Sequence, residues 1–309
     1  MGNWLALNGE FTEEKDGIIF HGGYLDSQPD LTDDSKTLGK FGILLFKDCM
    51  SSGEIEATIE FCTLSKNDEA EIVFNYQNET SFMCAGIANY PAKYEFKEFN
   101  NQWNYIRLSG FSSNLVDNKY KLNLEIRGSI VQLSVNGIKV LSGMSLTPIK
   151  ITNVGLWVRS KSSIKISGFK AHYKQAVAFT VSQFGGSYDI LYNDVIKPIC
   201  EQMGLKSIRG DEVSTNSLII EDIISLIRSS DVIIVDISPD NPNVFYELGY
   251  AHAICKPTVL LCEKTCRAKL PFDVSGFRTI FYDNSIGGKK YVEHHLEEHL
   301  KALGVATMK

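Results

Sequence analysis

Two folds are predicted along this 309-residue chain, an all-β jelly-roll sandwich followed by an α/β parallel sheet. Three observations predict them. Short strand-like runs fill residues 53–173, and from residue 176 apolar runs alternate with helical patterns. The length is sufficient for two cores. Because the change occurs near 171–175 without a Gly-, Pro- or Ser-rich linker, we expect a sandwich domain over 1–173 and an α/β domain over 174–309.

The first half is typical of a sandwich because its strands are short and closely spaced. Asn136-Gly137 predicts a two-residue type I′ hairpin turn, since both central residues of that turn need positive φ. The runs that predict strands are GEIEATIEF, EAEIVFNYQ, SFMCAGIA, WNYIRLSGF, YKLNLEIRG, SIVQLSVNG, VGLWVRS and SIKISGFKAHY.

The order of the last strands, YKLNLEIRG to SIVQLSVNGIKVLSG to VGLWVRSKSSIKISGFKAHY, resembles the closing strands of concanavalin A-like, laminin-G-like jelly rolls. The resemblance covers roughly residues 1–173 and implies a sensor or assembly domain with an unknown carbohydrate or protein ligand. Trp103 and Trp157 could stack on a sugar. In alternating strands such residues are more often core, which is the interpretation we favour.

Composition limits the remaining function classes. A net charge of -6 and a pI near 5.6 argue against broad nucleic-acid binding. No apolar run reaches the roughly 20 residues needed to cross a bilayer, and the start lacks the pattern of a signal peptide. The seven cysteines are scattered, and Cys262 and Cys266 lack the further ligands of a zinc site. Reduced thiols, no metal and a cytoplasmic location are therefore expected.

The second half predicts alternating strands and helices that form a doubly wound, flavodoxin-like parallel sheet. A helix over 188–203 should end before Gly204 and bend at Pro198. The predicted strands are VAFTVSQF, LKSIRG, DVIIVDIS, PTVLLCEK and RTIFYD, and the predicted helices are YDILYNDVIKPICEQM, SLIIEDIISLIRSS, NVFYELGYAHAI and KKYVEHHLEEHLKAL.

Ligands of such sheets bind beyond the carboxyl ends of the strands, where three loops of this chain meet. Gly185 and Gly186 could bring backbone amides close to an anion, or could simply form a tight turn. Arg209 lies next to Asp211, which could equally be a solvated ion pair. The third loop, DISPDNPNVFYE, leads into the helix that carries Glu247.

Glu247 is the candidate catalytic residue. Val244, Leu248, Ala251 and Cys255 share the helix stripe that should face the sheet, and Glu247 lies on its flank, toward the crevice. Partial desolvation would raise the pKa of this carboxyl, whereas the helix N-terminus would lower it. The alternative is that Glu247 only offsets the helix dipole or caps backbone donors.

NPNVFYELGYAHA after DVIIVDISPD, together with FGGSYDILYNDVIKPICEQMGL, RGDE and LPFD, resembles the TIR-like and nucleoside 2-deoxyribosyltransferase-like superfamily over about 176–303. The resemblance implies an N-glycosidase with Glu247 as the catalytic carboxylate. NAD would be the substrate, hydrolysed to nicotinamide and ADP-ribose or a cyclic product, with no cofactor. The setting implied is antiviral defence, with self-association through either domain. The alternatives are 2-deoxyribosyl transfer and non-catalytic nucleotide sensing.

The same resemblance assigns roles to the surrounding residues. A base or ribose would lie against aromatic rings, and phosphate would meet glycine amides or the arginine. Asp236 would hold ribose hydroxyls or orient Glu247. Asn243 is expected to be the helix N-cap and His252 a packing residue. The substrate-binding residues predicted in this way are Phe184, Gly185, Gly186, Tyr188, Arg209, Asp211, Asp236, Ser238 and Asn241.

Overall fold

The computed structural model describes residues 2–24, 39–65, 67–111, 115–212, 218–267 and 269–305. The chain forms two compact units, and the main junction between them lies between Lys174 and Gln175. Two short stretches, Arg127–Ile130 and Ser145–Lys150, group with the second unit. Among the described residues, no helix is long and apolar enough to span a bilayer.

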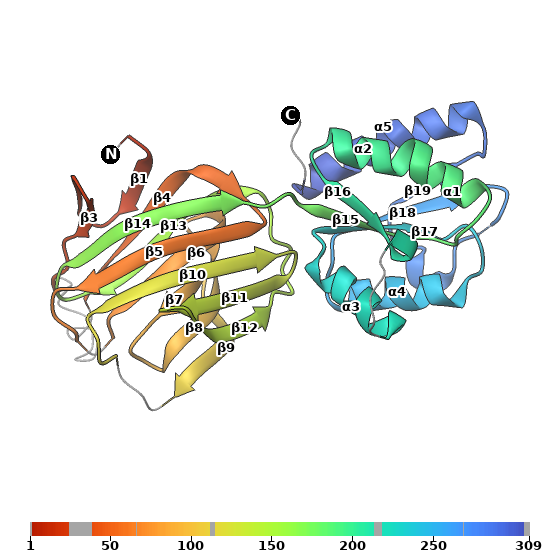
Figure 1. The fold of residues 1–309 in the computed structure, drawn as a ribbon. Helices are drawn as coiled ribbons and strands as arrows, with labels where there is room; N and C mark the ends of the chain where they lie inside the picture. Colours follow the sequence, from red (N-terminus) through yellow and green to blue (C-terminus); the bar gives the residue numbers. More distant parts are fainter. Residues whose placement is uncertain are drawn as a thin grey trace. The chain divides into compact units, whose positions relative to one another are not determined.

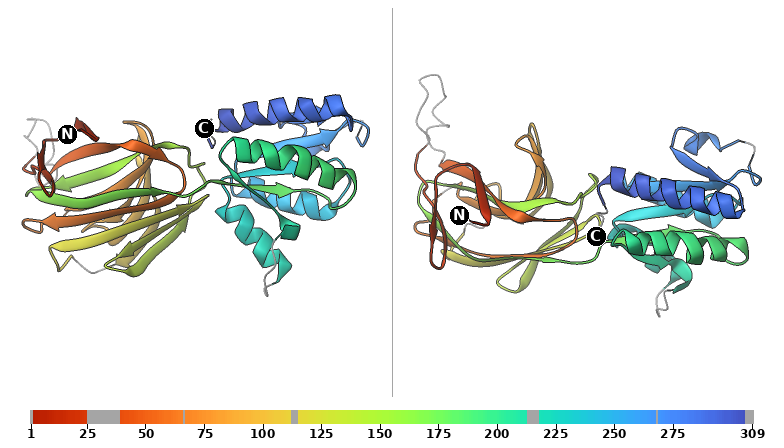
Figure 2. Two further views of the ribbon diagram at one scale, coloured as in Figure 1. Left: turned by 45° about the horizontal axis from the view of Figure 1, so that its top comes forward. Right: turned by 90° about the horizontal axis from the view of Figure 1, so that it is seen from above.

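The first unit is a sandwich of two seven-stranded sheets, seen from several sides in Figures 1 and 2. Its neighbouring strands pair antiparallel wherever the register is defined. Sheet one has the order β1 (Trp4–Asn8), β4 (Lys40–Met50), β13 (Thr152–Ser160), β6 (Glu69–Asn78), β7 (Ser81–Ile87), β8 (Ala92–Asn100) and β9 (Trp103–Phe111). Sheet two has the order β12 (Ile138–Met144), β11 (Ile130–Val135), β10 (Lys119–Arg127), β5 (Gly53–Phe61), β14 (Ile164–Tyr173), β3 (Gly17–Phe20) and β2 (Phe11–Glu14). The predicted jelly-roll sandwich is confirmed at this level.

The strand alternation explains the core of the sandwich. In β5 every second residue is fully buried, and β10 and β11 follow the same rule. A period of two places alternate side chains on opposite faces of a sheet. The Asn136-Gly137 turn joins β11 to β12 with φ of 51° and 80°, as a type I′ turn requires.

The second unit is built on five parallel strands in the order β16 (Lys206–Arg209), β15 (Val177–Val181), β17 (Val232–Asp236), β18 (Thr258–Glu263) and β19 (Thr279–Tyr282). Every residue of β17 is buried, as expected for a strand with helices over both faces. Figure 1 shows α1, α2 and α5 over one face, and α3 and α4 over the other. The helices are α1 (Ser187–Leu191), α2 (Lys197–Gln202), α3 (Ile219–Ser229), α4 (Pro242–Ala253) and α5 (Ile286–Leu303).

Pro198 changes the first predicted helix. Instead of one kinked α-helix over 188–203, the chain forms α1, a π-helical turn over Tyr192–Ile196, and α2. Proline cannot donate a hydrogen bond, and its ring displaces the preceding turn. The element still ends as predicted, because Gly204 adopts φ of 79° just beyond it.

The α4 helix corrects two details of the prediction. Its N-cap is Asn241, whose side chain accepts from the Asn243 backbone N–H at 3.0 Å, so Asn243 is not the cap. Pro242 occupies the first helical position, for which its fixed φ is suited, and the helix therefore begins earlier than predicted. Val244, Leu248 and Ala251 are buried as expected, but Cys255 is exposed because α4 ends at Ala253.

The two glycines that open α5 have different surroundings, which makes them a matched pair. A Cβ on Gly288 would lie 1.8 Å from the Asp283 carbonyl oxygen, whereas one on Gly287 would meet only the Ser285 hydroxyl at 3.9 Å. We expect Gly288→Ala to lower the free energy of unfolding of the second unit by about 1–3 kcal/mol. Gly287→Ala should leave it unchanged or raise it by up to about 1 kcal/mol.

Circular dichroism at 222 nm during urea unfolding measures this difference, because the α-helices of the described residues all lie in the second unit. The three tryptophans lie in the first unit, so their fluorescence serves as an internal control and should not change. Equal stability of the two variants would contradict the packing argument.

Candidate functional site

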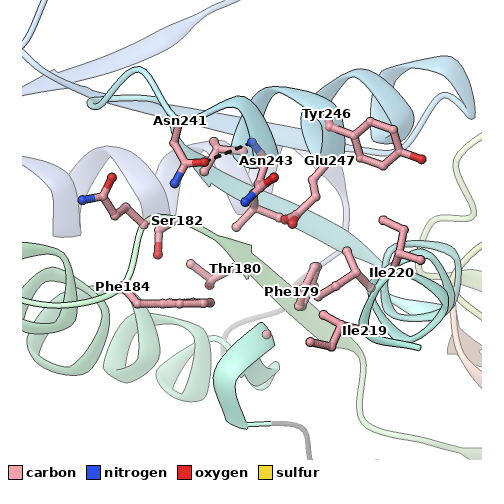
Figure 3. A pocket seen from close by; sticks show the side chains of 15 residues that line it. Phe179, Thr180, Ser182, Phe184, Ile219, Ile220, Asn241, Asn243, Tyr246 and Glu247 are labelled. Carbon is pink, nitrogen blue, oxygen red and sulfur yellow. Dashed lines mark hydrogen bonds between the residues drawn. The ribbon is translucent and has the colours of Figure 1, made fainter. Parts of the chain in front are cut away.

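Glu247 lines a cavity of about 420 Å³ at the carboxyl edge of the parallel sheet. Figure 3 shows its side chain extending from α4 into the space above β15, with the Phe184 ring on the opposite side. Asn241 and Asn243 border the same cavity. The structure therefore brings together three of the predicted site residues, Phe184, Asn241 and Glu247. Asn243 also lines this cavity, although the sequence predicted only a helix-capping role for it.

The Glu247 carboxyl is partly buried, which is unusual for an acidic side chain on a surface helix. Burial raises the pKa of its carboxyl to about 7, and no described residue gives it a hydrogen bond or an ion pair. The buried Thr180 and Ser182 hydroxyls, which line the same cavity, also have no hydrogen-bond partner among the described residues. Unpaired buried polar groups are rare in native proteins and frequently mark sites that hold a ligand or water. The alternative in which Glu247 caps backbone donors is not what the structure shows.

In the loop predicted to bind phosphate, the Gly185 amide and Arg209 already pair with side chains of the protein. Asp189 accepts a hydrogen bond from the Gly185 backbone N–H at 3.0 Å and pairs with Arg209 at 2.8 Å. Arg209 also makes a two-point contact with Asp211, at 2.6 and 2.7 Å. The Gly185 amide, followed by Arg209, lowers the pKa of Asp189, which keeps this carboxylate charged. Gly186 has positive φ but, like Gly185 and Arg209, does not line the Glu247 cavity.

Asp236 and Ser238 are buried in a hydrogen-bonded cluster between strand ends, and neither residue lines the Glu247 cavity. Both Ser238 and Tyr282 donate to the Asp236 carboxylate, the latter at 2.8 Å. Ser238 also accepts from the Glu263 backbone N–H at 2.7 Å. Burial raises the pKa of Asp236, although the bonds from Ser238 oppose this. Their hydrogen bonds tie β17, β18 and β19 together, which differs from the predicted contact with ribose.

Tyr188 and His252 were also assigned roles from the sequence, and their surroundings differ. Tyr188 is not among the residues that line the Glu247 cavity, and its hydroxyl lies near Cys266. His252 stacks on Phe277 with ring centroids 4.2 Å apart, and burial lowers its pKa. The prediction that His252 is a packing residue is confirmed.

The sandwich contains a second cavity, of about 430 Å³, which the sequence analysis did not identify. Its walls are mainly aromatic, and polar groups from Asn8, Glu79 and Arg159 border it. The apolar lining residues are Phe41, Ile43, Phe82, Phe99, Trp103 and Trp157. All of these residues belong to sheet one or its connecting turns.

The curvature of sheet one creates this cavity. Trp157 on β13 and Trp103 on β9 are separated by three intervening strands, which in a flat sheet would place their strands roughly 19 Å apart. Their rings nevertheless meet with centroids 5.8 Å apart. Phe41 stacks on Trp157 at 6.1 Å, and Phe82 lies edge-on to Trp103 at 5.7 Å. The sheet therefore curls around a concave apolar face that lies opposite the main core.

The sequence carried a signal for this face. In β4, Ile43 and Leu45 belong to the apolar cluster on the concave face, which we call the concave cluster. Leu44, which lies between them in the sequence, is buried as well. The same double burial occurs in β6 and β13, whose patterns are nearly continuous. Continuous apolar runs in an antiparallel sheet indicate that both faces are covered. The choice of core over sugar stacking for Trp103 and Trp157 was therefore incomplete, because both rings pack in the concave cluster and also line the cavity.

A buried charge cluster lies beside the two tryptophans. The Lys97 ammonium contacts Glu69 at 3.1 Å, Glu71 at 3.2 Å and Glu95 at 2.9 Å, and all four side chains are at least 96% buried. The same ammonium lies 4.4 Å from the centre of the Trp103 ring. This is a cation–π geometry.

Proton sharing is built into the cluster. Burial lowers the pKa of Lys97, but the three carboxylates outweigh this effect and raise it above its usual value. Burial, followed by the charge of Glu71, raises the pKa of Glu95 to about 8. Arg159 supplies a second cation through Glu69. Burial also raises the pKa of Glu71. Three buried carboxylates then face two cations, and the raised pKa values of Glu71 and Glu95 favour one proton held within the cluster.

Comparisons with known proteins give fold resemblances to the first unit. No family model matches the chain, and no curated protein matches it. A carbohydrate-binding module from Bacillus subtilis aligns with 14% identity and a TM-score of 0.45, covering 55% of this chain and 95% of the module. A B. subtilis protein of unknown function with a galectin-like fold aligns at 10% identity and TM-score 0.40, covering 55% and 89%. A tetrameric galectin from a Cinachyrella sponge aligns at 13% and 0.33, covering 43% and 100%.

The expectation of NAD hydrolysis is wrong. The solved structures that resemble the chain have names that describe carbohydrate-binding modules, galectin-like folds and glycoside hydrolases. In the second unit, Asp189 and Asp211 already neutralise Arg209, and no Lys or Arg is among the described residues that border the Glu247 cavity, so none of them can hold a pyrophosphate there. The antiviral setting rested on NAD depletion and is withdrawn with it.

Lys97 should be essential to the stability of the sandwich. Lys97→Met leaves three buried carboxylates without their shared cation, and we expect the free energy of unfolding to fall by about 3–5 kcal/mol. Tryptophan fluorescence during urea unfolding measures this. Lys119→Met is the matched control, because Lys119 pairs with Glu60 on the surface and its loss should cost less than about 1 kcal/mol. Similar losses in the two variants would contradict the role of the cluster.

The pKa of Glu247 predicts a pH dependence for the second unit. Between its unfolded value of 4.5 and its folded value of about 7, the folded chain binds more protons at this site, so stability falls as pH rises through that range. We expect Glu247→Gln to match the parent chain at pH 4 and to be more stable by roughly 1–3 kcal/mol at pH 8. Helical circular dichroism in urea tests this. An unchanged difference between pH 4 and pH 8 would show that Glu247 is solvated.

Proposed function

We propose that the sandwich binds carbohydrate in the concave cavity of sheet one. The observation that carries this proposal is the cavity itself, which combines aromatic walls with polar groups at its border. Its volume of about 430 Å³ lies within the range of about 300–1,000 Å³ that is usual for small-molecule sites.

The chemistry of the walls suits a sugar ring. A pyranose has one face formed by C–H groups, and this face packs on an aromatic ring while the hydroxyls point outward to polar partners. Phe41 is 43% exposed and lies parallel to the Trp157 ring, with an interplanar angle of 12°. Trp103 stands almost perpendicular to Trp157, at 78°. The two directions form a corner into which a ring can fit with contacts on its face and on its edge.

For the second unit we infer a flavodoxin-like, TIR-like class. The support is the strand order, which in chain order of the five strands reads 2-1-3-4-5, together with the position of NPNVFYELGYAHA at the carboxyl edge. Glu247 as a catalytic carboxylate, self-association of the chain and a cytoplasmic location stay predictions. The unpaired carboxyl of Glu247 in its cavity is the feature that supports the first of these.

Phe41→Ala tests the sugar site. The substitution removes an aromatic wall that is partly exposed, so the fold should remain while affinity falls by about tenfold or more. The full chain would be screened on an array of immobilised oligosaccharides. Affinity for any glycan retained would then be measured by isothermal titration calorimetry.

Phe111→Ala is the matched control, because Phe111 is 64% exposed at the end of β9 and does not line the cavity. Its affinity should equal that of the parent chain. Binding should also change the tryptophan emission, since Trp103 and Trp157 line the cavity. Absence of binding to any glycan, or equal binding by Phe41→Ala, would overturn the proposal.

A further inference from the structure

Within the described part of the chain, the cation that lines the sandwich cavity is already paired, whereas the carboxylate that lines it is not. Arg159 is the one cation among its described lining residues, and Glu79 is the one carboxylate. Arg159 is already paired with the buried Glu69, and its Nε donates to the Asn67 carbonyl at 3.3 Å. Its charge is therefore neutralised from within the protein, and it cannot balance an anionic ligand without a buried acid losing its partner.

The described groups next to the cavity supply no free cation. Trp157 and Glu71 are direct partners on neighbouring strands, so their side chains share the concave face. Glu69 and Glu95 join Glu71 around Lys97. Among the described residues, the Oε1 atoms of Glu71 and Glu95 are buried without hydrogen-bond partners. A ligand carboxylate placed on the tryptophans would therefore lie beside buried acids whose cations, Lys97 and Arg159, are already paired.

Two polar groups remain available to an uncharged ligand. Asn8 uses its Oδ1 to accept from the Ile43 backbone N–H at 2.6 Å, which fixes the amide and leaves its Nδ2 as a donor at the cavity. Glu79 lies in the exposed turn between β6 and β7, and no described residue pairs with its carboxylate. A carboxylate accepts strongly from hydroxyl groups, and hydrogen bonds to charged groups are the stronger kind.

We propose that this cavity selects uncharged sugar residues and rejects acidic ones, with Glu79 accepting from ligand hydroxyls and Asn8 donating to a ring or hydroxyl oxygen. This inference rests on the proposed sugar-binding function and adds the chemical class of the ligand. Uronic acids and sialic acids carry a carboxylate that has no free cation to meet at the cavity. Neutral hexoses satisfy both polar groups and leave the Arg159–Glu69 pair intact.

The experiment compares matched glycans with the full chain. Galactan oligomers are paired with oligogalacturonates, cello-oligosaccharides with their glucuronate counterparts, and N-acetyllactosamine with its sialylated form. Affinities are measured at low and high salt, because screening should reduce the discrimination. We expect at least tenfold tighter binding of the neutral member in the pair that binds, and a smaller ratio at high salt.

Variants at Glu79 complete the test. Glu79→Gln keeps the size of the side chain and should weaken neutral-glycan binding about tenfold. Glu79→Lys should move the preference toward the acidic member. Glu60→Lys is the control for net charge, since Glu60 lies on sheet two and does not line the cavity. It should leave the neutral-to-acidic ratio unchanged.

The outcomes separate the two proposals. Tighter binding of acidic glycans by the parent chain, or neutral binding that is indifferent to Glu79→Gln, would overturn this inference and leave sugar binding in place. A lack of binding to every pair would overturn the sugar-binding function, and the inference with it.

Discussion

The contact between the Lys97 ammonium and three buried carboxylates is the constraint on which the shape of the sandwich depends. It joins β6 to β8 across β7, on the face that curls, and the ammonium is also in contact with Trp103 of β9. An ion cluster of this kind is stable in a protein interior only if its members are held closely together. The same contacts that hold the cluster therefore hold the sheet in its curved form, and the curvature produces the aromatic cavity.

The two units use buried charge in opposite ways. In the sandwich, carboxylates are gathered around a cation, and the raised pKa values of Glu71 and Glu95 favour one shared proton. In the α/β unit, Glu247 is isolated, and its pKa is raised by burial alone. An isolated carboxyl responds directly to whatever enters its cavity, whereas the clustered ones are buffered by one another. The Asp189–Arg209–Asp211 chain beside it shows a third arrangement, in which a loop supplies its own counter-charges.

Sequence patterns predicted the elements that follow simple periodicity. The alternation in β5, the buried run of β17 and the Asn136-Gly137 turn each follow from local rules, and the parallel sheet with its helices follows from their order. The position of Glu247 beside a cavity could also be predicted, because helical geometry placed that residue on the flank that faces the sheet. The concave cavity could not be predicted from the sequence, because it depends on the curvature that brings Trp103 to Trp157 across three strands. Nor could spacing reveal that Asp189 would take the position predicted for a phosphate, since that depends on the conformation of one loop.

The strand pairing of the sandwich has a consequence for synthesis on the ribosome. β4 pairs with β13, and β3 pairs with β14. These early strands therefore cannot form their pairs until strands more than a hundred residues further along the chain have been synthesised. Sheet one is complete only when Ser160 has left the exit tunnel, and sheet two only when Tyr173 has left it. Until then the apolar strands between them have unpaired edges, and they are exposed to wrong pairing with other nascent chains. The parallel unit is translated after the sandwich, and its neighbouring strands are much closer in sequence. The sandwich, which is the slower of the two units to assemble, therefore emerges before the parallel unit, and holdase chaperones would bind chiefly to its unpaired strands.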